Sequence, residues 1–363
     1  MTERLNRRML LAGTAALAAG TVWPRRSIAS LAKVVEGTLT ALSLTERIAQ
    51  LFLVPVASTA LTAEEETWLR TAKPGGVLLL GSNMGTPEEI ATLIAAIRAT
   101  NPDVPPAVAA DQEGGLVTRL PGDPAPGALE LGALPDEEVA AYARQRAEFL
   151  TDYGVTVNLA PVADIAWTPD SFMAGRSFGS DPATVADKVA AYLRGAAGVD
   201  VAHCVKHFPG HGRGATDSHV ALPIVDLSLE EWRATDGVPF AAAVAAEAPM
   251  VMLGHLLYPQ WDARPASLSP EAVRVLREDL GFAGAIVTDD LGMEALAAYG
   301  PLETLDLAFA AGVDWFLYAI LPLPPRDLID HLARRVERGD IDGADIDDRV
   351  RRVLAVKLGA GAG

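Results

Sequence analysis

The sequence lacks several features on which common classes of protein depend. It has one cysteine, Cys204, among 363 residues, so no disulfide can form within the chain. Basic residues are also few, because 30 lysines and arginines stand against 47 aspartates and glutamates and give a net charge of -17. Nucleic acids and anionic membrane surfaces repel such a chain, and we expect neither as its main partner. A neutral or cationic small substrate agrees better with this charge.

No low-complexity segment divides the chain, and half of its residues are hydrophobic. This is enough for one large α/β domain or two smaller ones. Short apolar runs alternate with stretches rich in alanine and leucine that suit helices. The eight runs span residues 48–56, 75–81, 106–112, 155–162, 201–208, 248–256, 284–290 and 313–320.

This alternation is typical of parallel strands that are buried on both faces, and eight such units predict a (β/α)8 barrel of the TIM type. A doubly wound open sheet is the alternative that the pattern leaves. The GxGxxG motif, which binds dinucleotides in many open sheets, does not follow the first run. We therefore predict a single-domain α/β barrel over residues 30–363.

The N-terminus has an apolar run of residues 9–22, which is too short to cross a bilayer comfortably but suits the core of a signal peptide. Arg7 and Arg8 precede it directly, as in the twin-arginine export route. We predict that residues 1–29 are an export signal and that the protein is periplasmic or extracellular. A helical extension without a role in export is the alternative. No cysteine follows the run to carry a lipid, so we expect no stable membrane anchor.

Polar side chains stand where several of the apolar runs end, although the interiors of the runs carry almost no charge. They are Asp111, Gln112, Glu113, Asp164, Lys206, His207, His255, Asp289 and Asp290. The carboxyl ends of barrel strands meet at one rim, where barrel enzymes build their active sites. Titratable groups that converge in this way predict a catalytic site.

The segment KHFPGHGRGATDSHVALP, residues 206–223, gathers three of the six histidines. His207 and His211 have the spacing of a helical zinc site, but the intervening proline and glycine prevent a helix, so we expect no metal. Asp217 and His219 flank one serine, and a carboxylate beside an imidazole can hold its pKa near neutral for proton transfer. A histidine bonded to a nearby aspartate by local turn chemistry is the alternative that these residues leave open.

KHFPGHG followed by DSH resembles the signature of glycoside hydrolase family 3, in its β-N-acetylglucosaminidase branch. Three further stretches match this family in order: DQEGGLVTRL (111–120), NLAPVADI with GRSFGSDP (158–182), and LREDLGFAGAIVTDDLGM (276–293). The His/Asp loop is specific to the branch, whereas the VTDD stretch is shared with the family at large. One residue departs from the pattern, because many relatives have arginine where this chain has Leu116.

The resemblance implies roles for individual residues. Asp289 would be the nucleophile, His219 the general acid/base, and Asp217 the partner of His219. Five residues match positions that hold the sugar in the family: Asp111, Arg119, Arg176, Lys206 and His207. Structural ion pairs are the alternative for these five, and Arg176 in particular would then pair with Asp181. The resemblance implies no metal and no organic cofactor. His203 and His255 are expected to pack or to support the site, and His211 has no assigned role.

Physical reasoning agrees with the implied roles. A retaining glycosidase needs an ionised carboxylate beneath the anomeric carbon and a proton donor at the leaving oxygen. Glycines at 210, 212 and 214 would let the loop move over the sugar. Because neighbouring residues of a regular strand face opposite ways, two sugar contacts from Lys206 and His207 predict a bulge or a strained peptide bond near His207.

The activity implied is that of a retaining β-N-acetylhexosaminidase acting on N-acetylglucosaminides from peptidoglycan, and a monomer is expected. Two alternatives remain within the enzymes: a β-glucosidase or β-xylosidase of the same family, and a phosphorylase that uses the same residues. A cell-wall-binding protein with a degenerate site is the alternative outside the enzymes. The intact Asp217, His219 and Asp289 argue against it.

Overall fold

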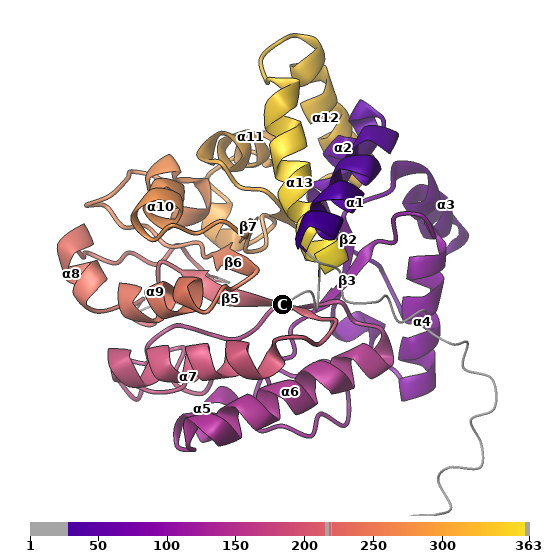
Figure 1. Cartoon of the computed structure of the whole chain (residues 1–363). Coiled ribbons are helices and arrows are strands. Elements are labelled where there is room, and N and C mark those ends of the chain that lie inside the picture. Colours follow the sequence, from indigo (N-terminus) through magenta and orange to yellow (C-terminus); the bar gives the residue numbers. More distant parts are fainter. Residues whose placement is uncertain (1–27, 215–217, 219, 360–363) are drawn as a thin grey trace, which may run out of the picture.

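The computed structural model describes residues 28–214, 218 and 220–359. A parallel sheet stands at the centre of the molecule and helices surround it (Figure 1). Its strands are β1 Phe52–Pro55, β2 Gly76–Leu79, β3 Ala107–Ala110, β4 Val157–Asn158, β5 Ala202–Phe208, β6 Met250–Leu253, β7 Ala285–Thr288 and β8 Phe316–Leu317. Each strand lies within one of the eight apolar runs of the sequence.

The strands pair in the order β7-β6-β5-β4-β3-β2-β1-β8. The two ends of this order also meet, because Val287 bridges Trp315 in parallel and the backbone N–H of Thr288 donates to the carbonyl of Trp315 at 3.1 Å. The sheet is therefore a nearly closed barrel. The predicted (β/α)8 fold is confirmed, and the open-sheet alternative is wrong.

Helices occupy the stretches between the strands. They are α1 Ile28–Ala41, α2 Leu44–Gln50, α3 Ala63–Ala72, α4 Pro87–Ala99, α5 Ala128–Gly132, α6 Asp136–Tyr153, α7 Pro182–Ala196, α8 Leu229–Ala234, α9 Gly237–Ala245, α10 Pro270–Arg274, α11 Pro301–Ala311, α12 Pro325–Glu337 and α13 Gly343–Gly359. Four short pieces, η1 Gly81–Asn83, η2 Ala266–Leu268, η3 Val275–Asp279 and η4 Glu294–Leu296, complete the described elements.

Local sequence signals explain where many of these helices begin. Four have a complete capping box, in which a serine or threonine and the glutamate three residues later bond each other's backbone N–H. Several others begin with proline at the first helical position, where a missing N–H does no harm. The strands, in contrast, are short and buried on both faces, so their stability comes from packing within the barrel.

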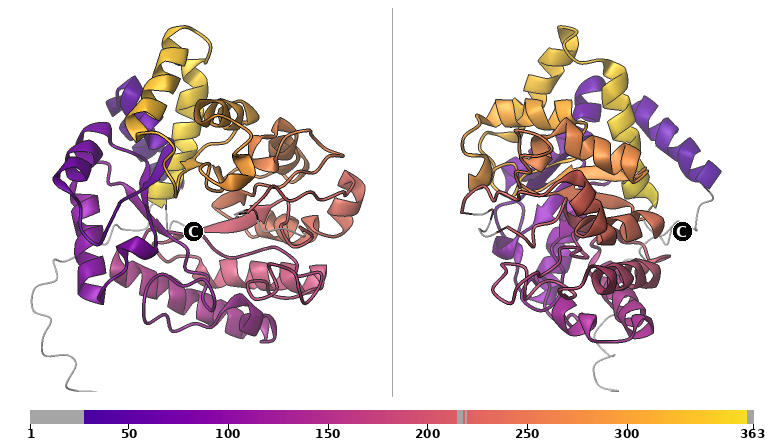
Figure 2. Two further views of the ribbon diagram at one scale, coloured as in Figure 1. Left: turned by 180° about the vertical axis from the view of Figure 1, so that it is seen from behind. Right: turned by 90° about the vertical axis from the view of Figure 1, so that its left-hand side faces the viewer.

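The last strand is followed by two helices rather than one. α12 and α13 rise beside α2 in Figures 1 and 2, and α13 packs against α1, so both ends of the described chain meet there. Arg349 of α13 donates to the carbonyls of Phe309 and Val313, which anchors this helix to the end of α11. Among the helices described, none is both long and apolar enough to cross a bilayer. Residues 1–27, which make up most of the predicted export signal, lie outside the described residues.

Candidate active site

Most of the predicted site residues lie at the carboxyl rim of the barrel. Asp111 follows β3 directly, Lys206 and His207 lie near the end of β5, and Asp289 follows β7. Arg176 comes from the long connection between β4 and α7, and Arg119 comes from the segment after β3. The barrel thus brings residues from four separate strand ends to one opening.

A network of opposite charges joins four of the five predicted sugar-binding residues. The ammonium of Lys206 lies 2.6 Å from Asp111 Oδ1 and 2.7 Å from Glu113 Oε1. Arg176 binds the same Glu113 in a bidentate pair, at 2.9 and 2.7 Å. Arg119 is 3.7 Å from Asp111 Oδ2. Glu113 is therefore the centre of the network, a role that the sequence did not reveal.

The charges in this network stabilise one another. Burial alone would raise the pKa of Glu113, but the charges of Lys206 and Arg176 outweigh it and lower that pKa to about 2. Burial likewise opposes the charge of Lys206, yet Asp111 and Glu113 raise its pKa above the ordinary value. Glu113 and Lys206 therefore stay charged at neutral pH. Because the Asp111 side chain is 19% exposed, unlike the buried Glu113, it is accessible to a ligand in the opening.

Arg176 does not bind Asp181, which was the structural alternative for this arginine. Asp181 instead caps α7, where its side chain accepts hydrogen bonds from the backbone N–H and the hydroxyl of Thr184. Arg176 is directed to the rim by Glu113, and the ring of Phe172 lies 5.6 Å from its guanidinium carbon. This arginine thus belongs to the charged network of the barrel mouth.

The end of β5 has the irregular backbone that its two neighbouring site residues predicted. The pairing of β5 with β6 shifts register between Val205 and Phe208, and the Lys206–His207 peptide bond is cis. Lys206 reaches the charged network, while the Nδ1 of His207 lies 2.6 Å from Asp164 Oδ2. The two side chains, although adjacent in the chain, therefore both make contacts at the same rim of the barrel.

Asp164 orients His207 from a fully buried position in the segment after β4. It accepts hydrogen bonds from both Nδ1 and the backbone N–H of His207. Burial would raise the pKa of Asp164, but the contact with His207 outweighs it and lowers the pKa. An imidazole that donates from Nδ1 to a carboxylate presents Nε2 as the nitrogen that can contact a substrate.

The two aspartates after β7 have separate surroundings. The backbone N–H of Asp289 donates to the carbonyl of Leu253 in β6, and its carboxylate accepts from the N–H of Asp290 at 2.8 Å. Burial would raise the pKa of Asp289, but His255 and His207 lead the groups that lower it to about 2. Asp289 is therefore ionised at neutral pH and lies close to the groups that surround the opening.

Asp290 has a structural role. Its Oδ1 accepts from the backbone N–H of Gly292 and of Ala319, each at 2.9 Å, and so joins the loops after β7 and β8. His255 supports the same corner, because Nε2 lies 2.8 Å from the carbonyl of Asp290 and Nδ1 lies 2.7 Å from the hydroxyl of Ser267. These contacts agree with the expectation that His255 packs or supports the site.

Asp217 and His219 lie outside the described residues, so their predicted roles stay predictions. The serine between them is described and is buried, with its hydroxyl 3.0 Å from Nε2 of His211. Gly212 has a reason other than mobility for being glycine, because a Cβ there would collide with the carbonyl of Ile165. At least this one of the three loop glycines is required by close packing.

The family model described as "Glycosyl hydrolase family 3 N terminal domain" matches residues 43–356, most of the chain. The chain belongs to glycoside hydrolase family 3. It is 38% identical over 260 residues to the beta-hexosaminidase of Stenotrophomonas maltophilia strain R551-3, covering 69% of this chain and 77% of that protein. It is also 34% identical over 332 residues to beta-hexosaminidase LpqI of Mycobacterium tuberculosis, covering 87% of this chain and 83% of the relative.

Solved structures agree with this family assignment. A family 3 beta-N-acetylglucosaminidase from Paenibacillus sp. matches with a TM-score of 0.84 at 32% identity, over 88% of this chain but only 63% of that one. A Beta-N-acetylhexosaminidase from Beutenbergia cavernae matches with a TM-score of 0.79 at 33% identity, over 87% of this chain and 99% of that one. The predicted family, its β-N-acetylglucosaminidase branch and the glycoside hydrolase class are confirmed.

The sequence analysis placed two further residues at this rim but gave them no function. Glu113 and Asp164 both follow apolar runs, which marked them as rim residues. Their partners, however, lie far along the chain: Arg176 is 63 residues from Glu113, and His207 is 43 residues from Asp164. The local sequence therefore predicted where these two residues lie. Their contacts with Arg176 and His207 form only when the barrel brings distant parts of the chain together.

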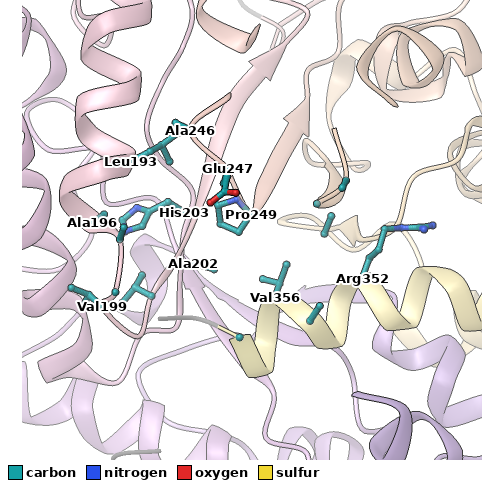
Figure 3. Close-up of a pocket in the computed structure, with 18 residues that line it drawn as sticks. Leu193, Ala196, Val199, Ala202, His203, Ala246, Glu247, Pro249, Arg352 and Val356 are labelled. Atoms are coloured by element: carbon teal, nitrogen blue, oxygen red, sulfur yellow. The ribbon is translucent and has the colours of Figure 1, made fainter. Parts of the chain in front are cut away.

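A cavity of about 340 Å³ lies at the other end of the barrel (Figure 3). It is lined by residues at the beginning of β5 and β7 and by α13, including His203, Ala285 and Val356. Of the predicted site residues that the structure describes, none lines it. His203 is buried there with its ring edge-on to Tyr192 at 5.4 Å, which agrees with its expected packing role. This cavity is separate from the candidate active site.

Proposed function

We propose that this family 3 enzyme is a retaining β-N-acetylhexosaminidase that releases N-acetylglucosamine from the non-reducing ends of peptidoglycan fragments. The observation that carries the proposal is the position of Asp289 directly after β7, with His255, His207 and Lys206 close enough to stabilise its negative charge. A retaining glycosidase needs such a carboxylate to attack the anomeric carbon. The names of the relatives support the N-acetylhexosamine specificity.

In the first step, Asp289 attacks the anomeric carbon and forms a covalent glycosyl–aspartate. The bond from that carbon to the leaving oxygen breaks, and the oxygen receives a proton from the imidazolium of His219. In the second step, His219 removes a proton from water, and the oxygen of that water attacks the anomeric carbon and displaces Asp289. Two inversions give a product that keeps the β configuration. Asp217 stabilises the imidazolium form of His219 and holds its tautomer.

The charged network holds the sugar during both steps. Asp111, Lys206 and Arg119 offer charged hydrogen-bond partners to sugar hydroxyls, and charged partners make stronger hydrogen bonds than neutral ones. Nε2 of His207 offers another contact, because Asp164 occupies Nδ1. Arg176 contacts the sugar while Glu113 keeps its guanidinium in place. The acetamido group is the feature by which this enzyme distinguishes an N-acetylglucosaminide from a glucoside.

The N-terminal pattern supports the proposed compartment, and the resemblance to family 3 β-N-acetylglucosaminidases supports the proposed substrate. A signal with Arg7 and Arg8 before a short apolar run would export the enzyme to the space where cell-wall fragments occur. There the acidic enzyme acts as a monomer on soluble fragments. No part of this proposal requires a metal or an organic cofactor.

One experiment separates the proposed activity from its alternatives. The protein is incubated with nitrophenyl N-acetyl-β-glucosaminide and with the matching β-glucoside, each with and without inorganic phosphate. We expect faster release of nitrophenol from the acetamido sugar and free N-acetylglucosamine in both buffers. Preference for the glucoside would favour a β-glucosidase. A sugar phosphate that forms only with phosphate would identify a phosphorylase, and no release from either substrate would favour a binding protein.

A further inference from the structure

The exposed apolar side chains of the described residues gather at one end of the barrel. Six large hydrophobic side chains are exposed within residues 28–214, 218 and 220–359. Each lies in a connection that leaves the carboxyl end of β3, β4, β5 or β8. They are Leu116, Leu129, Phe172, Val220, Ile224 and Ile320. A single exposed leucine needs no explanation, whereas several on the face that carries the site point to a ligand.

Two of the six lie beside a predicted sugar-binding residue. Leu116 packs over Gly175, the residue before Arg176, so closely that a Cβ at Gly175 would collide with Cδ1 of Leu116. The ring centre of Phe172 lies 5.6 Å from the guanidinium carbon of Arg176. Leu116 comes from the segment that also supplies Glu113, so its contact with Gly175 joins the two segments that form the Glu113–Arg176 pair.

Leu116 is nearer to solvent than the charged groups of the rim. It is 78% exposed, whereas the side chains of Arg176 and Lys206 are 14% and 3% exposed. An enzyme that removes a terminal sugar takes that sugar into the opening, and the rest of the substrate extends toward solvent. The group beyond the scissile bond, the aglycone, therefore meets the outer residues of the rim and not the charged network beneath them.

We propose that Leu116 and Phe172 form an aglycone subsite, an apolar surface against which the group beyond the scissile bond packs. This inference rests on the proposed function and deepens it, because it names a substrate class. The enzyme prefers N-acetylglucosaminides whose aglycone presents an apolar face next to the glycosidic bond. The acidic groups of a peptidoglycan fragment then lie farther from that bond.

The charges of the rim agree with this preference. Leu116 stands where many relatives have arginine, so this chain offers no cation at that position to an anionic aglycone. The cations of Lys206 and Arg176 are already paired, because Glu113 binds both and Asp111 binds Lys206 as well. The net charge of -17 also repels anions.

A series of aryl N-acetyl-β-glucosaminides tests the subsite. The aglycones are phenyl, para-methylphenyl and para-tert-butylphenyl, with meta-carboxyphenyl as the anionic member. A para-alkyl group enlarges the apolar surface of the leaving phenol and barely changes its acidity, so the need for a proton stays the same along the alkyl series. The measurement is kcat/KM, which reports the steps up to departure of the aglycone.

The wild type should prefer the larger apolar aglycones. A fully buried methylene favours binding about fourfold, and a half-open surface gives less, so we expect kcat/KM to rise about 5-fold from phenyl to para-tert-butylphenyl. The meta-carboxyphenyl substrate should be slower than the phenyl substrate.

Substitutions of Leu116 then assign the preference to this side chain. Leu116→Ser should lower kcat/KM for the para-tert-butylphenyl substrate about 3- to 10-fold and remove most of the alkyl gain. Leu116→Met keeps an apolar side chain of similar volume and should retain the gain. Leu116→Arg should reverse the charge preference, so that the meta-carboxyphenyl substrate becomes faster than the phenyl substrate.

Leu129→Ser is the matched control. Leu129 is an exposed leucine of the same connection between β3 and α6, but it lies on α5, which packs against α6 and α7. This variant should keep the alkyl gain. Phe172→Ala should reduce the gain as Leu116→Ser does, and inhibition by free N-acetylglucosamine measures in the same variant whether Arg176 still holds the sugar.

Several outcomes would overturn the proposal. They are an alkyl gain that survives Leu116→Ser or Phe172→Ala, an equal loss in Leu129→Ser, and a loss of the same size for every substrate, which would indicate a displaced Arg176. A changed oligomeric state of Leu116→Ser with an unchanged gain would make the rim a contact between copies and would also overturn it. Failure of the proposed function is distinguishable, because the wild type would then release no phenol from any N-acetylglucosaminide.

Discussion

The backbone N–H of Asp290 donates a hydrogen bond to the carboxylate of Asp289 at 2.8 Å, so two adjacent acids are linked while their side chains serve different purposes. The carboxylate of Asp290 accepts from Gly292 and Ala319 and joins two loops of the rim. The carboxylate of Asp289 remains near the imidazoles of His255 and His207 and is ionised. This division supports Asp289 as the nucleophile of the proposed mechanism.

We predict that a slowly turned-over fluorinated N-acetylglucosaminide leaves its sugar on Asp289. The label should be assigned by fragment-ion mass spectrometry of the digested protein, since both acids occur in one peptide. Asp289→Ala should lose about 10³-fold or more in rate, because the covalent route has no substitute. A label on Asp290, or a first product in the α configuration, would contradict the assignment.

A second prediction concerns His219 and Asp217. His219→Ala should remove most activity toward substrates with poor leaving groups and should affect nitrophenyl substrates less in the glycosylation step, because nitrophenolate leaves with little help. Asp217→Ala should act in the same direction by disturbing the tautomer and basicity of the imidazole. The measurement is kcat/KM against pH for both substrate types. An unchanged rate and pH profile for Asp217→Ala would leave that residue a loop-forming role only.

The third prediction concerns the stability of the charged network. Glu113→Gln leaves Lys206 and Arg176 without their shared carboxylate, and breaking a buried ion pair in this way typically costs about 3–5 kcal/mol. We expect a loss of this order in the free energy of unfolding at pH 7, measured with urea. The control is Glu66→Gln, which removes the exposed pair with Arg70 and should change stability by about 0.5 kcal/mol or less.

The pH dependence of the same variant gives an independent check. The pKa of Glu113 is about 2 in the folded protein against an ordinary 4.5, so its stabilising contribution is fully present above pH 4.5. That contribution falls as the pH drops from about 4.5 to 2, where the folded-state carboxylate also gains its proton. The stability difference between wild type and Glu113→Gln should therefore shrink over this range. A difference that stays constant would show that the charge of Glu113 is not what stabilises the rim.

The fourth prediction concerns export. Replacing both Arg7 and Arg8 with lysine should leave the precursor in the cytoplasm if the twin-arginine route is used. The measurement is the distribution of the protein between cytoplasmic and exported fractions, with the wild-type precursor as the reference. Normal export of the double variant would exclude this route, and retention of the wild type would exclude the signal itself.

The residues themselves predicted much of the barrel and of its rim. Run length and the absence of internal charge placed all eight strands, because a strand buried on both faces must be apolar along its whole length. The capping boxes and N-terminal prolines determined where many helices begin, since these bonds form between residues three apart. The same local logic placed Asp111, Lys206 and Asp289 at strand ends, and the motif order then pointed to the family.

The tertiary structure alone decided how those groups are connected. Glu113 and Arg176 are 63 residues apart, and Asp164 and His211 are 47 apart, so nothing local requires either contact. The register shift in β5 directs Lys206 to one partner and His207 to another, and only the closed barrel brings both partners to that strand. Hydrogen bonds and ion pairs act over a few ångströms, whereas the chain reaches these distances only after the barrel closes.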